Sequence, residues 1–267
     1  MTRIAALLQK EFADLRHHPG LFIPPLFTAL VAIALPFIVA VVVPAVTGER
    51  LSDSSDFQIA VEMFRTQPIT NGMGAEGAIQ AWIFQQFLPL LVIAPVAASM
   101  SVAANAVVGE KQARTLEPLL ATPITTRELL TAKILGSLLP SLALTLACFV
   151  VYAAAMAAFA APGVYRILLA PRSLGVFFLL GPLAALAALQ LAVCVSSRVN
   201  DARTAQQIGV LVILPLAGAL VAQLTGSLML TMPIIVGIAA LLAVVNAGLM
   251  VIGIRLFDRE SILTRWK

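Results

Sequence analysis

Residues 109–133 read GEKQARTLEPLLATPITTRELLTAK, and this charged stretch separates two long apolar runs. The runs on either side, 77–109 and 134–165, contain no Asp, Glu, Lys or Arg. Each is longer than the roughly 20 apolar residues that an α-helix needs to cross a bilayer. The charged stretch is therefore expected to connect two transmembrane helices on one side of a membrane.

The rest of the chain also consists of long uncharged runs separated by shorter charged segments. Of its 267 residues, 60% are hydrophobic and 11% are charged, where a soluble protein carries about 25% charged residues. Residues 17–48, 173–197 and 204–254 are also uncharged. If the last run, 204–254, formed a single helix, that helix would be about 76 Å long, which is far more than the hydrocarbon core thickness of about 30 Å. We expect it to turn back within QLTGS at 223–227.

These runs predict an all-α, polytopic membrane protein with six transmembrane helices. The helices are expected near 21–46, 82–107, 130–160, 173–196, 205–224 and 232–256. With six spans, both termini and the connections 109–133 and 196–204 share one side. That side holds thirteen of the 17 basic residues. Because basic residues are enriched in cytoplasmic connections, we expect both termini in the cytoplasm. The net charge of +4 thus reflects topology, and no basic patch with aromatic residues indicates nucleic-acid binding.

The first 19 residues are expected to form an amphipathic helix that lies in the membrane interface. Their apolar stripe comprises Ile4, Leu7, Leu8, Phe12 and Leu15. We expect this helix over 1–19, a single six-helix domain over 20–257 and a cytoplasmic tail over 258–267. The longest outer connection is 47–80, in which 66–77 is expected to be irregular.

The charged stretch contains local signals for two short helical segments. Arg114 follows Glu110 by four residues, a spacing at which the two side chains can pair on a helix. Pro123 is expected to end this first segment. Thr125 and Glu128 form a capping box that begins the next helix. The first segment also offers an apolar face of Leu116, Leu119 and Leu120. A connection with exposed leucines is suited to docking another protein.

The sequence offers no catalytic constellation and no metal site. It lacks HExxH, GxSxG, CxxC and the GxxxxGK[ST] phosphate loop, so we expect no cofactor and no ATP site in this chain. Its only histidines, His17 and His18, are adjacent and point apart on a helix. The predicted spans also lack the buried acids and bases on which proton-driven transporters depend. An energy source outside the chain is therefore expected.

Polar side chains and prolines inside the spans are candidates for a substrate pathway. Pro89 and Pro95 each remove a hydrogen bond from the second span, so we expect the span to bend and the freed carbonyls to need other donors. The pathway candidates are Gln85, Pro89, Asn105, Gln190 and Asn246. Hydrogen bonding between helices is the default role for the amides among them, and contact with a substrate is the alternative.

Residues 109–133 resemble the signature of the ABC type-2 exporter permeases. In this signature an acidic residue stands at the end of the second span, the pattern "TLE-LL-TP" follows it, and the pattern "ELL-K" stands at the beginning of the third span. The expected amphipathic helix over 1–19 is similar to the elbow helix of that family. Residues 196–207, SSRVNDARTAQQ, are similar to the second cytoplasmic loop of the family. Pro118 departs from the pattern and would bend or shorten the coupling helix.

The resemblance implies a permease that works as a dimer, homodimeric or heterodimeric, with separate ABC ATPase subunits that bind ATP and Mg²⁺. It assigns ATPase coupling to Glu110, Arg114, Thr115, Leu116, Glu117, Pro123, Arg198, Asp201 and Arg203. The expected function is ATP-driven export across the cytoplasmic membrane. Two alternatives stay open: a non-transporting anchor or signalling subunit of an ATPase complex, and a stand-alone channel or carrier.

Overall fold

The computed structural model describes residues 3–53, 73–112, 125–199, 201–225 and 230–256, and all regular segments in them are helical. In order these are α1 Arg3–His17, η1 Pro19–Phe22, α2 Ile23–Phe37, η2 Ile38–Val42, α3 Val43–Thr47, η3 Leu51–Asp53, α5 Ala75–Gln86, α6 Leu88–Gln112, α8 Thr126–Phe159, η6 Val164–Leu169, α9 Pro171–Gly175, η7 Val176–Leu180, α10 Gly181–Ser196, α11 Ala202–Leu224 and α12 Met232–Leu256.

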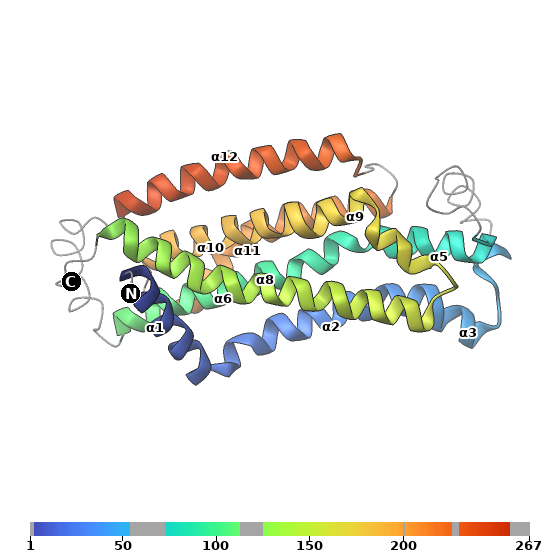
Figure 1. Cartoon of the computed structure of the whole chain (residues 1–267), viewed down its shortest axis with the longest axis horizontal. Coiled ribbons are helices and arrows are strands. Elements are labelled where there is room, and N and C mark those ends of the chain that lie inside the picture. Colours follow the sequence, from blue (N-terminus) through green and yellow to red (C-terminus); the bar gives the residue numbers. More distant parts are fainter. Residues whose placement is uncertain (1–2, 54–72, 113–124, 200, 226–229, 257–267) are drawn as a thin grey trace.

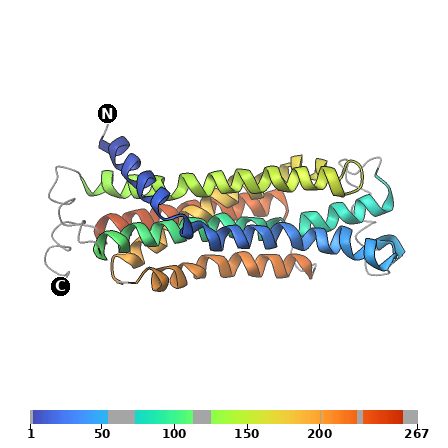
Figure 2. The same cartoon turned by 90° about the horizontal axis from the view of Figure 1, so that it is seen from below.

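In the described ranges of the chain, six helical stretches are long and apolar enough to cross a membrane, which confirms the predicted fold class. They are Pro19–Thr47, Ala75–Gln112, Thr126–Phe159, Pro171–Ser196, Ala202–Leu224 and Met232–Leu256. The beginning of α1, the end of α6, the beginning of α8 and the end of α12 lie together at one end of the bundle, which we call the basic end (Figure 1). α3 and α5 lie at the opposite end (Figures 1 and 2).

The second and fourth spans form the centre of the bundle. α6 packs against α10, and these two helices contact α2, α8, α11 and α12 around them. In the most apolar 18-residue stretch of the second span, 78% of the residues are buried. In the corresponding stretch of the fifth span, 6% are buried. Many large apolar side chains of α2, α11 and α12 are exposed, as the lipid-facing surface of a membrane bundle requires.

The second span differs from its predicted bounds of 82–107. α5 already begins at Ala75, so the last residues of the predicted connection 47–80 are helical. The reason lies in a contact that the sequence did not indicate. Glu76, in the first turn of α5, accepts hydrogen bonds from the backbone N–H groups of Leu51 and Ser52, both at 3.3 Å. This contact fixes the helix start against η3.

The second span breaks near Pro89, one of the two prolines from which a bend was predicted, whereas α6 continues as a helix through Pro95. Phe87 separates α5 from α6, two residues before Pro89, which has no N–H to donate to the carbonyl of Gln85. The Gln223 amide from α11 donates to that carbonyl at 3.3 Å. In return, the Gln86 amide donates to the carbonyl of Gln223, also at 3.3 Å. A side chain of another span thus satisfies a backbone group that the proline freed.

In the first span, too, a side chain of another span donates to a backbone carbonyl that a proline cannot reach, and this side chain is Gln80. Pro44 cannot donate to the carbonyl of Ala40, and Gln80 Nε2 donates to it at 3.2 Å. Gln80 Oε1 accepts from the backbone N–H of Ala161 at 2.7 Å, beyond the end of α8. This one buried amide therefore joins the first three spans near the ends that lie opposite the basic end.

Gln80→Leu is expected to lower the free energy of unfolding by about 1–3 kcal/mol, because it leaves buried backbone groups without partners. Thermal unfolding of the purified protein measures the loss as a lower Tm. Gln9→Leu, at an exposed position of α1, is the matched control and should leave the Tm near that of the unmutated chain. Equal melting temperatures for both variants would contradict this role of Gln80.

Candidate functional site

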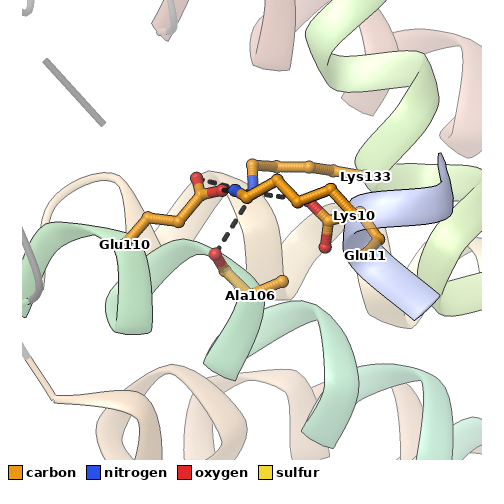
Figure 3. A network of polar contacts seen from close by, with 5 residues as sticks. All are labelled: Lys10, Glu11, Ala106, Glu110 and Lys133. Carbon is orange, nitrogen blue, oxygen red and sulfur yellow. Dashed lines mark hydrogen bonds and ion pairs between the residues drawn. The ribbon is translucent and has the colours of Figure 1, made fainter. Parts of the chain in front are cut away.

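A network of four charged side chains joins three helices at the basic end (Figure 3). Lys133 of α8 lies at its centre. Its Nζ is 2.7 Å from Glu110 Oε2 of α6 and 3.1 Å from Glu11 Oε1 of α1. It also donates to the backbone carbonyl of Ala106 at 3.1 Å. Lys10 of α1 completes the network by pairing with the other oxygen of Glu110.

The network is largely removed from solvent. The Lys133 side chain is 1% exposed, whereas Lys10 at the rim is 38% exposed. Two cations face two anions, so the cluster carries no net formal charge. A buried ion pair stabilises a fold only when its remaining hydrogen-bonding capacity is used. Here Lys133 has three oxygen partners. Burial alone would lower the pKa of Lys10, but the hydrogen bond to Glu110 and the negative charges of Glu110, Glu11 and Asp14 together outweigh burial, so the pKa lies above its ordinary value.

α1 approaches α8 closely beside this network. A Cβ atom placed on Gly136 would lie 2.9 Å from the Cβ of Glu11. Leu7 and Glu11 are the buried residues of α1, and Glu11 stands one turn after Leu7 on its apolar stripe. Glycine at 136 therefore permits the approach that brings Glu11 to Lys133.

Gly136→Ala is expected to separate α1 from α8 and weaken the contact between Glu11 and Lys133. Limited proteolysis in detergent should then cleave within α1 faster than in the unmutated protein. Gly248→Ala on α12 is the matched control, since nothing lies within 4 Å of a Cβ added there. Alanine in a helix is otherwise favourable by up to about 1 kcal/mol, so the control should not lose stability. Equal cleavage of α1 in both variants would contradict the close approach.

The charged stretch 109–133 is described at its two ends. The predicted capping box is present: Thr125 Oγ1 accepts from the backbone N–H of Glu128 at 3.2 Å, and the Glu128 carboxylate accepts from the backbone N–H of Thr125 at 2.8 Å. Glu110 contacts Lys10 and Lys133, partners that the sequence did not indicate. The other coupling candidates of this stretch lie outside the described residues, namely Arg114, Thr115, Leu116, Glu117 and Pro123.

The second connection at the basic end runs between α10 and α11. Asp201 caps α11 by accepting from the backbone N–H groups of Arg203 and Thr204, both at 3.2 Å. These hydrogen bonds, with the charge of Arg203, hold the pKa of Asp201 below its ordinary value. Arg198, Asp201 and Arg203 are all exposed. The three candidates of this connection therefore share one short, exposed turn.

The pathway candidates are distributed over several spans. Gln85 and Pro89 flank the break in the second span, and Asn105 donates to the Ser101 carbonyl at 2.8 Å within α6. Asn246 of α12 donates to the carbonyl of Leu183 at 3.1 Å. Within the described residues no hydrogen bond joins one candidate to another. Three of them bury a side-chain oxygen that accepts no hydrogen bond from the described part of the chain, namely Gln85, Gln190 and Asn246.

The sequence did not single out Lys10, Glu11 or Lys133 as parts of one site. A signal for Glu11 was nevertheless present, because a carboxylate at this position interrupts an apolar helical stripe between Leu7 and Leu15. Lys133 likewise follows the buried Leu129 by four residues and the buried Leu130 by three. A charge on an apolar face indicates a buried partner, but it does not say which one.

A family model described as "ABC-2 family transporter protein" matches residues 58–252. The match covers most of the chain and runs from the connection 47–80 into α12. No curated protein matches the chain.

Proposed function

Since the chain belongs to the ABC-2 transporter family and is a membrane permease component of an ABC transporter, we propose that it is the transmembrane subunit of an ATP-driven exporter. A separate ATPase subunit would bind ATP and Mg²⁺. Its closure on ATP would act on the charged stretch 109–133 at the basic end. The permease would work with a second permease copy, identical or related.

The ion-pair network is the observation that supports this proposal most. The charged stretch leaves the bundle at the end of α6 and returns at the beginning of α8. Glu110 and Lys133 link these two ends at 2.7 Å. A displacement of the stretch would therefore act on α6, α8 and, through Glu11, α1 together. Because α6 packs at the centre of the bundle, the displacement would reach the surrounding spans.

The distribution of basic residues supports the orientation. In the cytoplasmic membrane of a cell, the basic end would face the cytoplasm, where ATP is available. Arg50, Arg166 and Arg172 would then lie on the outer side, near the opposite end of the bundle. The proposed pathway is lined by amides and the break at Pro89, without an ionisable group among its candidates. Drugs, lipids, ions and small peptides are all compatible substrates.

The test is reconstitution of the chain with its ATPase in liposomes, with a panel of labelled drugs, lipids and peptides. Transport should require ATP and an ATPase whose catalytic residues are intact. Transport by the chain alone, without ATP, would instead establish the channel or carrier alternative. An ATPase whose hydrolysis ignores every substrate, in vesicles without ATP-dependent transport, would favour the anchor or signalling alternative.

A further inference from the structure

Three glutamines from two spans meet at the break between α5 and α6. The Gln223 side-chain amide donates to the backbone carbonyl of Gln85, and the Gln86 amide donates to the backbone carbonyl of Gln223, both at 3.3 Å. Gln85 and Gln223 are buried, with exposed fractions of 3% and 1%. Their side-chain oxygens accept no hydrogen bond from the described residues. Buried polar atoms without a partner destabilise a fold, so two of them at one break indicate a role other than packing.

The Gln223 oxygen is an acceptor whose orientation is fixed by hydrogen bonding. The two ends of a glutamine amide have nearly the same shape, so the hydrogen bonds that they make decide which way the amide points. A carbonyl can only accept, so the nitrogen of Gln223 must face the carbonyl of Gln85. The oxygen of the same amide is therefore the atom without a donor. The Gln85 side chain makes no hydrogen bond with the described residues, so it can present its own oxygen to a donor at this break.

Two further amides of the described spans show the same chemistry. Gln190 of α10 and Asn246 of α12 each bury a side-chain oxygen that accepts no hydrogen bond from the described residues. The nitrogen of Asn246 donates to the Leu183 carbonyl, so its oxygen, too, is the atom left over. An ammonium or hydroxyl group would satisfy such an oxygen. A carboxylate or phosphate would instead bring a second acceptor against it.

The amides at the break are closed off in this structure, because both side chains are buried. One wall of the site is α11, which has the smallest buried share of the six spans, 6%. A ligand reaches the two amides when α11 moves away from the break. The hydrogen bonds that join Gln86, Gln223 and Gln85 are then exchanged for bonds to the ligand, so opening leaves these groups with partners.

We propose that the break between α5 and α6, together with Gln223 of α11, binds the hydrogen-bond-donating head of a substrate, an ammonium or hydroxyl group. This inference rests on the proposed function and narrows its substrate class. Gln85 and Gln223 accept from the head group through their side-chain oxygens. Anionic head groups are disfavoured, because the described part of this site offers them acceptors without a cation.

Equilibrium binding to the permease–ATPase complex in lipid nanodiscs, without ATP, tests the inference. The probes are dansyl, rhodamine and acyl-chain scaffolds, each made with an ammonium, a hydroxyl or a carboxylate at the end of the same alkyl linker. Binding to empty nanodiscs is subtracted. On at least one scaffold, an ammonium or hydroxyl probe should bind about tenfold more tightly than the carboxylate probe. The comparison of ammonium with hydroxyl then identifies which donor the site takes.

Gln85→Met removes an acceptor that no described residue satisfies. It should abolish most of the preference for donors and leave the Tm unchanged or higher. Gln85→Glu keeps the size of the side chain and both acceptor atoms, and should retain the preference for ammonium. Gln207→Met, the same substitution at an exposed position of α11, is the matched control and should keep both the preference and the Tm.

Equal or weaker binding of the donor-bearing probes on every scaffold, including no binding at all, would overturn the inference. A lower Tm of Gln85→Met with an unchanged preference would also overturn it, because Gln85 would then serve packing alone. Proteoliposomes separate this failure from that of the proposed function. ATP-driven transport of carboxylate and ammonium probes at equal rates would overturn the inference and leave the exporter function intact. Donor-selective movement without ATP would overturn the exporter function and leave the site.

Discussion

Lys133→Met is expected to destabilise the protein by about 3–5 kcal/mol, because it leaves buried carboxylates without their cation. Lys133 Nζ contacts Glu110 at 2.7 Å and Glu11 at 3.1 Å, and the Lys133 side chain is 1% exposed. Neither carboxylate can recover full hydration at this depth. Thermal unfolding in detergent should show the lower stability as a lower Tm and a smaller yield of monodisperse protein.

Two further variants separate the ion pair from a general loss of packing. Adding Glu110→Gln to Lys133→Met removes one charge of each sign and should recover much of the lost stability. Lys10→Met, at the 38% exposed rim of the network, should cost about 1 kcal/mol or less. If Lys133→Met melts at the temperature of the unmutated protein, the buried network does not stabilise the basic end.

Arg114→Glu is expected to weaken ATPase binding about a hundredfold or more, because it reverses a charge on the stretch proposed to contact the ATPase. The prediction follows from the charged stretch and from the family to which the chain belongs. Insertion should be normal, since Arg114 lies outside the uncharged runs that predict the spans. Pull-down of the ATPase by the tagged permease measures the effect.

Arg50→Glu makes the same charge reversal at an exposed position near the opposite end and is the matched control. It should retain the ATPase in full. Equal retention of the ATPase by both variants would remove Arg114 from the coupling surface. Glu110 is a less informative position for this test, because its substitution also breaks the contacts with Lys10 and Lys133.

The spans could be predicted from sequence because charges mark where the chain leaves the membrane. The sixth helix was predicted over 232–256, and the structure gives Met232–Leu256. The capping box of Thr125 and Glu128 was also predictable, because its two residues are three apart in the sequence. The start of α5 at Ala75 was not, since it depends on Glu76 contacting backbone groups 24 and 25 residues away.

The buried network could not be predicted for the same reason. Lys133 lies 122 residues from Glu11, and Lys10 lies 100 residues from Glu110. Only the packing of α1, α6 and α8 brings these charges together. From the sequence, Lys133 is predicted to be a charge at the water-facing end of a span. In the structure its side chain is only 1% exposed. Local spacing can show that a charge stands on an apolar face, but its partner is set by the tertiary fold.

Gentle extraction of the tagged chain from its native membrane tests most directly whether a separate ATPase drives this permease. A stoichiometric ATPase subunit should co-purify, and Arg114→Glu should release it while Arg50→Glu does not. A chain that is extracted without any ATPase, and that still conducts solute after reconstitution without ATP, would contradict the exporter function.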